Sequence, residues 1–219
     1  MNVIDIIIAL LRGDSPLSRT NPNAWHNYYH CVGSTYGTWL RGDPRGFRTQ
    51  RHMQHVDGDY KQPPPDIYKP LFEYNKKNLK YPPVKLSQDQ QRILCRAIVG
   101  SLQDDNALPV VLAIAVNHFH LLARFTQMSP ELIAKHKSHL LADERDPSPR
   151  FYLGRARQVA SFALAQQNLK PPSAVWASRP TCKPVRSREH QLAVARYIKA
   201  HVREGAAVWH INDGFLFER

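Results

Sequence analysis

The sequence predicts an α+β fold in which an antiparallel sheet carries helices on one face. Apolar segments of strand length alternate along the chain with longer segments of helical periodicity. The most apolar stretch, residues 107–125, is rich in branched side chains, which predicts two short central strands or one bent strand. An internal repeat, a P-loop and a dinucleotide-binding glycine motif are all absent from the sequence. These observations favour one domain built around a mixed helix and strand core.

The N-terminal third contains two extensions of this domain. Residues 1–24 form the first, in which the apolar stretch 3–12 predicts a short amphipathic helix, too short to cross a membrane. A strand is expected at about 25–34. Residues 41–84 are rich in proline, glycine and charge, which predicts an irregular basic insertion that could contact a nucleic-acid strand. An ordinary surface insertion remains the alternative.

The rest of the chain alternates helices and strands. Ser87 and Gln90 form a capping box, which predicts the start of a helix that reaches about residue 103. Trp209 and the apolar tail segment 215–217 are expected to fold back on the core. After the central strands, the expected elements are helices at about 130–142 and 148–168, a strand or hairpin at 174–186, a helix at 187–205 and a C-terminal tail at 210–219.

Composition limits the kind of partner. The chain has 219 residues, of which 42% are hydrophobic, enough for one domain with a core. A formal net charge of +12 favours an anionic partner. The three cysteines, Cys31, Cys95 and Cys182, are too far apart for a metal knuckle and too few for a disulfide framework, which suits a reducing cytoplasm.

The first chemical motif is His118-Phe119-His120, within the apolar central stretch. Alternate residues of a strand project from the same face, so both imidazoles are expected to point the same way. Together they could hold one divalent cation if a third ligand came from elsewhere. A pair of half-buried histidines satisfied by hydrogen bonds is the alternative.

The second motif lies on the helix expected at 187–205, where Ser187 is a natural N-cap and Gly205 fits the position after the last turn. Tyr197 and His201 are four residues apart, so they share one face of this helix. Helical spacing predicts the buried stripe: Leu192, Ala195, Ile198 and Val202.

A strand with His-x-His, followed by a helix with Tyr-x-x-x-His, resembles the single-tyrosine HUH endonucleases. These are the transposases of small insertion sequences and the REP-associated tyrosine transposases. Residues 28–32 are similar to the family's first core strand, and residues 154–160 to the helix before the last strand. The resemblance spans about residues 25–209 and implies a ferredoxin-like HUH palm.

The resemblance also implies roles for four residues. His118 and His120 match the HUH pair, His201 matches the third ligand to Mg²⁺ or Mn²⁺, and Tyr197 matches the nucleophile. The family more often has Gln or Asn where His201 stands. The implied reaction cleaves single-stranded or hairpin DNA through a 5′-phosphotyrosine and rejoins it. The implied protein is a monomer or homodimer of the bacterial cytoplasm or nucleoid.

Basic residues are concentrated around the tyrosine. Between residues 150 and 203 the chain has eleven Lys or Arg and one acid, Glu189. Neutralisation of DNA phosphates is the favoured interpretation, and a solvated basic face is the alternative. The expected DNA-binding side chains are Arg45, Arg48, Arg124, Arg155, Arg157, Arg186, Arg188, Arg196, Lys199 and Arg203.

Two other functions stay open. One is a non-catalytic DNA- or RNA-binding protein that keeps the fold. The other is a metal-dependent phosphodiesterase that uses water, with Tyr197 structural. Leu121 and Leu122 follow His120, so the zinc-hydrolase HxHxDH pattern is absent, which counts against the second.

Overall fold

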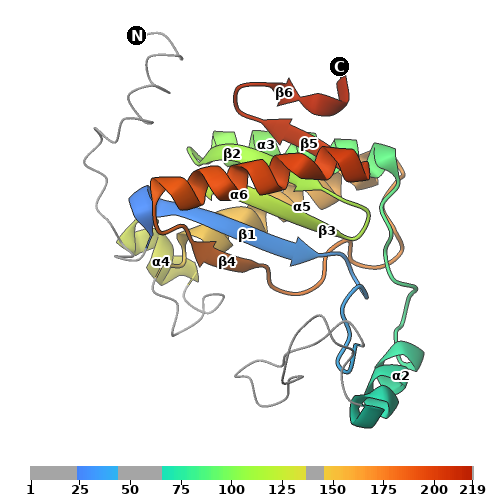
Figure 1. Ribbon diagram of the computed structural model, residues 1–219. Helices are drawn as coiled ribbons and strands as arrows, with labels where there is room; N and C mark the ends of the chain where they lie inside the picture. The colour runs from blue at the N-terminus through green and yellow to red at the C-terminus, as the bar shows by residue number, and fades with distance from the viewer. Residues whose placement is uncertain (1–23, 44–65, 137–145, 219) are drawn as a thin grey trace, which may run out of the picture.

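The computed structural model describes residues 24–43, 66–136 and 146–218 (Figure 1). Its centre is a six-stranded sheet in the order β4-β1-β3-β2-β5-β6, in which every neighbouring pair is antiparallel. Long helices lie against this sheet. The predicted α+β class with an antiparallel sheet is therefore confirmed.

The first four strands follow a ferredoxin-like path. The chain runs β-α-β-β-α-β, and both helical crossovers return to the same sheet, which gives the strand order β4-β1-β3-β2. A further helix then leads to two strands beyond β2. The elements of the sheet and its crossovers are β1 (Tyr28–Ser34), α3 (Gln88–Asp104), β2 (Leu108–Ile114), β3 (His118–Arg124), α5 (Ser148–Gln166), β4 (Thr181–Pro184), α6 (Arg188–Ala200), β5 (Ala207–His210) and β6 (Gly214–Phe215).

Helices cover both faces of the central strands. α3 and α5 lie against one face, as expected, and α6 crosses the opposite face (Figure 1). Phe119 and Leu121 belong to the core under α3 and α5, whereas Leu122 packs with Val194 and Ile198 of α6. The sequence predicts helices on one face of the sheet, and α6 adds a helix on the other. It is required because β2 and β3 are apolar on both sides, and an apolar face must be covered.

Helix ends follow the predicted signals. The Ser87 hydroxyl accepts from the Gln90 amide and the Gln90 side chain accepts from the Ser87 amide, so the capping box opens α3 as predicted. Ser187 caps α6 by accepting from the His190 amide at 3.2 Å. A 3-10 turn, His201–Glu204, extends α6, and Gly205 follows in the left-handed conformation, φ 77°. Both predicted ends of this helix are confirmed.

The predicted buried stripe of α6 is half right. Ile198 is buried and Ala195 packs against the second core, as predicted, but Leu192 is 45% exposed and Val202 is 41% exposed. The buried positions of this helix and the turn after it are Gln191, Val194, Ile198 and His201. Gln191 tolerates burial because its side-chain oxygen accepts from the Arg188 guanidinium and its side chain hydrogen-bonds with Tyr28. Periodicity of apolar residues missed this face because two of its four members are polar.

The segment predicted to be irregular contains a helix, α2 (Lys69–Lys77), after the 3-10 turn η3 (Asp66–Tyr68). Gly42 lies against it, and a Cβ at Gly42 would come within 2.6 Å of the Phe72 amide nitrogen. The proline-rich composition concealed this helix, although Pro70 occupies a first-turn position that proline tolerates.

The remaining described elements agree with the expected order. The strand expected from residue 25 begins at Tyr28, after the 3-10 turn η1 (Trp25–Asn27). Phe215 and Phe217 pack against the core, which confirms the returning tail. β6 pairs with β5, so part of the predicted tail belongs to the sheet. α4 (Pro130–His136) and the 3-10 turn η6 (Leu216–Glu218) complete the described elements.

Some predictions fall outside the described residues. These are the helix at 3–12, Arg45 and Arg48 in the insertion, and the end of the helix expected to reach 142. Within the described ranges, none of the helices has both the length and the apolar character needed to cross a membrane.

Candidate metal centre and adjoining tyrosine

Three histidines from two elements converge on the α6 face of the sheet. His118 and His120 come from β3, and His201 comes from the 3-10 turn that continues α6. Each offers one ring nitrogen, and these three nitrogens lie within 4.8 Å of one another. The three histidines proposed as ligands from the sequence therefore form one cluster that could hold a metal ion.

Strand alternation in β3 and the inward face of α6 bring the three histidines together. On β3 the intervening Phe119 points into the core under α3 and α5, so both histidines face α6. Burial of Ile198 in the second core holds α6 against the sheet and turns His201 inward, where it is 5% exposed. The ring centroids of His120 and His201 lie 4.9 Å apart.

Hydrogen bonds on the Nδ1 atoms orient all three rings. Nδ1 of His201 donates to the Tyr197 carbonyl at 3.1 Å, and Nδ1 of His118 donates to Asn117 Oδ1 at 2.8 Å. Nδ1 of His120 lies 3.1 Å from Nε2 of His30. A neutral imidazole that donates through Nδ1 keeps a lone pair on Nε2. His118 and His201 thus keep Nε2 as a free ligand atom, and His120 does so in the tautomer whose Nδ1 donates to His30. Each ring has the outer partner typical of metal-binding histidines.

His30 is a site residue that the sequence analysis missed. It lies on β1, next to β3, and its ring stacks on that of His120 with centroids 5.3 Å apart and an interplanar angle of 28°. The sequence held one signal for it: on the first core strand, alternation puts His30 on the same face as Tyr28 and Val32. The partner strand and the register decide the contact, and neither is visible in the sequence.

Electrostatics keep His120, His30 and His118 neutral. Burial lowers the pKa of His120 to about 3, with the neighbouring His118 and His30 as the next causes. Burial also lowers the pKa of His30 to about 4, with the Lys183 charge as the next cause. The pKa of His118 is lowered by burial and by His201. Neutral imidazole is the form that binds a metal, so these rings are ready ligands at neutral pH.

Tyr197 lies at the edge of the cluster. Its ring centroid is 5.2 Å from that of His120 and 4.9 Å from that of His201. The His30 ring is 6.3 Å away. Tyr197 is 52% exposed, so a large substrate can reach it while the histidines beneath stay covered. The phenol therefore lies at the solvent side of a potential metal site, within reach of a molecule bound there.

The predicted DNA-binding cations separate into several groups. Lys199 pairs with Asp213 at 2.7 Å, and Arg124 is buried beside Tyr28. Arg188 contacts Gln191 and the Trp25 ring. Arg155 and Arg157 lie on α5, across the sheet from the histidines (Figure 1). The solvent-exposed cations on or beside α6 are Arg186, Arg188, Arg196 and Arg203.

Lys183 is a cation near the site that the DNA-binding prediction omitted. It pairs in register with His30 across β1 and β4, and its charge lowers the pKa of that ring. The sheet thereby brings an exposed lysine of the edge strand close to the histidine cluster.

Comparison with known protein families, with curated proteins and with solved structures finds no match to this chain. The geometry of the three histidines and Tyr197 is therefore the basis for any function assigned to the protein.

Proposed function

We propose that this protein is a metal-dependent single-stranded DNA endonuclease and transposase that cleaves and rejoins DNA through a 5′-phosphotyrosine. The observation that supports it is the placement of an exposed Tyr197 beside a cluster of three histidines, with its ring centroid 4.9 and 5.2 Å from those of two of them. A nucleophile, a cation site and basic surface residues are the parts that phosphoryl transfer needs.

The donor set fits a divalent ion. His118, His120 and His201 supply three nitrogens, and the remaining coordination positions are open to water or phosphate. Mg²⁺ prefers oxygen ligands and imidazole suits transition ions, so Mn²⁺ is favoured over Mg²⁺. When bound, the ion would polarise the scissile phosphate and neutralise charge on its oxygens.

Tyr197 supplies the nucleophile. Its phenolic oxygen attacks phosphorus, a new oxygen–phosphorus bond forms, and the bond to the 3′ oxygen breaks. The phenol loses one proton and the departing 3′ oxygen gains one, so the step balances. The reverse attack by another 3′ hydroxyl releases Tyr197 and rejoins DNA. The hydrogen bond from His201 Nδ1 to the Tyr197 carbonyl links the nucleophile to a ligand, which favours a fixed separation.

The test is formation of a covalent protein–DNA species. Purified full-length protein would be mixed with end-labelled single-stranded oligonucleotides carrying hairpins, with Mn²⁺, Mg²⁺ or EDTA, and products resolved on denaturing gels. We expect a metal-dependent, protease-sensitive band that Tyr197→Phe abolishes. Tyr74→Phe is the matched control, because Tyr74 is 67% exposed on α2, outside the cluster, and should leave the band intact.

A second candidate function has its own observation. Three histidines with an open position form a ligand set of catalytic zinc, which activates water. The protein would then be a metal-dependent phosphodiesterase with no covalent intermediate. In that case Tyr197→Phe would retain cleavage. Hairpin binding with no cleavage under any metal would instead indicate a non-catalytic nucleic-acid-binding protein.

A further inference from the structure

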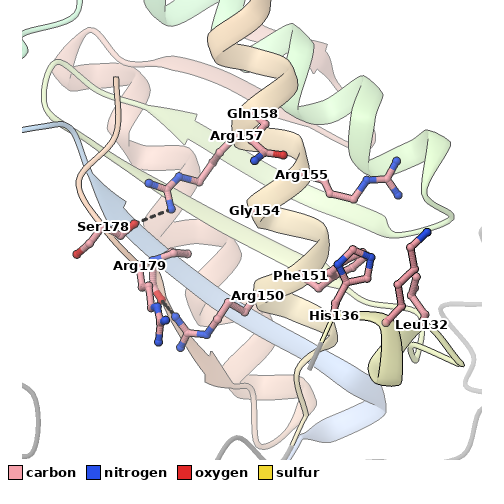
Figure 2. Close-up of a pocket in the computed structure, with 12 residues that line it drawn as sticks. Leu132, His136, Arg150, Phe151, Gly154, Arg155, Arg157, Gln158, Ser178 and Arg179 are labelled. Atoms are coloured by element: carbon pink, nitrogen blue, oxygen red, sulfur yellow. Dashed lines mark hydrogen bonds between the residues drawn. The ribbon is translucent and has the colours of Figure 1, made fainter. Parts of the chain in front are cut away.

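A basic hollow lies on the α5 side of the sheet, away from the histidine cluster. It has a volume of about 700 Å³ and is formed by α4, α5 and the segment 178–180 that precedes β4 (Figure 2). Five Lys or Arg line it, and none of its described lining residues is Asp or Glu. The lining cations are Lys135, Arg150, Arg155, Arg157 and Arg179.

The cations of this hollow are held in different ways. Arg155 pairs with Asp105 at 2.8 Å. Arg157 donates instead to the carbonyls of Ala177 and Ser178. Carbonyl oxygens hold a guanidinium in place without cancelling its charge. Arg157 therefore keeps a positive charge at this wall, where an anion would be stabilised.

Arg157 adds an unsatisfied donor. It is 8% exposed, and its Nε finds no hydrogen-bond partner among the described residues. Burial lowers the pKa of Arg157 to about 10, so the side chain stays charged at neutral pH. A buried donor without a partner is costly, so this guanidinium is held at the wall at some expense of stability.

A second hollow continues the first along α5. The two share Gly154, Arg157 and Gln158, and the second, of about 460 Å³, adds Lys170 and Phe162. Phe162 is 63% exposed, which is unusual for a large apolar ring unless something covers it. We call the two hollows together the α5 groove.

We propose that the α5 groove binds a segment of single-stranded nucleic acid, with phosphates on Arg179, Lys170 and Arg157 and a base stacked on Phe162. Basic grooves with an exposed aromatic ring are the usual way to bind a single strand without reading its sequence. In a duplex the faces of the bases are stacked on one another, so a duplex could contact the basic side chains but could not stack on Phe162. The inference rests on the proposed function for the class of ligand.

The edge strand links the groove to the tyrosine site. Pro180 lines the groove, and Lys183, three residues later on β4, pairs with His30 beside the histidine cluster. Three residues of strand span about 10 Å. One strand of nucleic acid crossing β4 could thus contact the α5 groove and Tyr197 together, and the groove would hold the flank of a cleaved strand.

The test measures binding without cleavage. A Tyr197→Phe background without metal would be titrated onto a fluorescein-labelled oligothymidylate of about 20 nucleotides, a length suited to a single-strand groove, by fluorescence anisotropy. We expect Lys170→Ala with Arg179→Ala to weaken binding about tenfold and to lower the slope of log K against log salt by about 1.4, from two lost phosphate contacts. Phe162→Ala should weaken binding about tenfold through lost stacking.

Matched controls come from α2 and the segment after it. Lys77→Ala with Lys80→Ala removes the same charge, and Tyr74→Ala removes a ring that is 67% exposed. Both should change binding less than about twofold. All substituted groove residues are exposed, so folding should survive, which thermal melting followed by circular dichroism would check.

Three results would overturn the groove proposal: no binding of the oligothymidylate, equal losses in groove and control variants, or equal affinity for a duplex of the same length. If the Tyr197 covalent band forms while groove variants bind normally, the groove proposal alone fails. If the band is absent while binding depends on the groove, the nuclease proposal alone fails.

Discussion

The two faces of β3 differ around residues 118–120, although their residues alternate along one strand and Leu122 is buried on the α6 face. Toward α3 and α5, Phe119, Leu121 and Ala123 are fully buried in the main core. Toward α6, His118 and His120 hold polar rings that face other polar rings. The first face is closed by apolar packing. The second is covered only in part by α6, which leaves Tyr197 at its open side.

This difference shows how one strand can serve stability and chemistry at once. Burial of apolar surface is non-directional and fills the side under two long helices. Ligand groups need fixed directions instead, and hydrogen bonds through Nδ1 supply them at His118, His120 and His201. If the two faces divide stability and ligand binding in this way, substitutions on the apolar face should lower stability, and substitutions on the histidine face should lower metal affinity.

The largest effect is expected on the apolar face. Phe119→Ala should lower the free energy of unfolding by about 3–5 kcal/mol, because a large buried ring is removed from a closed site. Phe119 is 0% exposed, contacts the Trp176 ring and leaves room only for glycine at position 33. Urea unfolding would measure the change. Val116→Ala is the nearby exposed control, and an equal loss there would refute the comparison.

The histidine face should make the metal-free protein sensitive to acid. The folded pKa values of His120 and His30 are about 3 and about 4, below the ordinary value of 6.5. Between each folded value and 6.5, the unfolded chain therefore binds more protons than the folded protein. Stability contributed by the neutral rings is complete above pH 6.5 and is lost as pH falls toward 4. Thermal melting in EDTA across this range would measure it. A double variant, His30→Gln with His120→Gln, should lose less over the same range, and an identical loss would contradict the assignment.

The outer partner of His120 should affect metal binding but not the fold. His30→Phe keeps a ring against His120 and removes the hydrogen-bond partner of its Nδ1. We expect Mn²⁺ affinity to fall by about 10–100-fold, the usual cost of removing such a partner. His30→Gln restores an acceptor and should recover part of the affinity in the same titration. Unchanged affinity in His30→Phe would mean that His30 does not orient the ligand.

The smallest effect on stability is expected at His118. His118→Ala removes a half-buried ring whose hydrogen bond to Asn117 is worth about 1 kcal/mol, so the free energy of unfolding without metal should change by no more than that. The contrast with its neighbour Phe119 sharpens the comparison. A loss of 3 kcal/mol or more, an order typical of core truncation, would place His118 in the structural framework.

Much of the fold and half of the site could be predicted from local signals. The His-x-His alternation and the four-residue spacing of Tyr197 and His201 are local rules, and both hold in the structure. The capping box at Ser87 also needs only neighbouring residues. These features were visible because the backbone geometry of a strand or helix fixes them.

Features that depend on pairing were not predictable. His30 joins the site only because β1 lies beside β3 in one register. The buried face of α6 was assigned only in part, because Gln191 and His201 are buried with hydrogen-bond partners, which hydrophobic periodicity does not detect. Arg157 was grouped with the basic residues around Tyr197, yet α5 places it across the sheet, in the groove opposite.

The central claim is that the α6 face of β3 forms a divalent-metal site. Electron paramagnetic resonance of Mn²⁺ tests it most directly, because the signal of free Mn²⁺ diminishes as the ion binds. We predict one bound ion per chain, retained in Tyr197→Phe and lost in a double variant, His118→Ala with His120→Ala. Equal binding by that double variant, or no binding by the unaltered protein, would contradict the account.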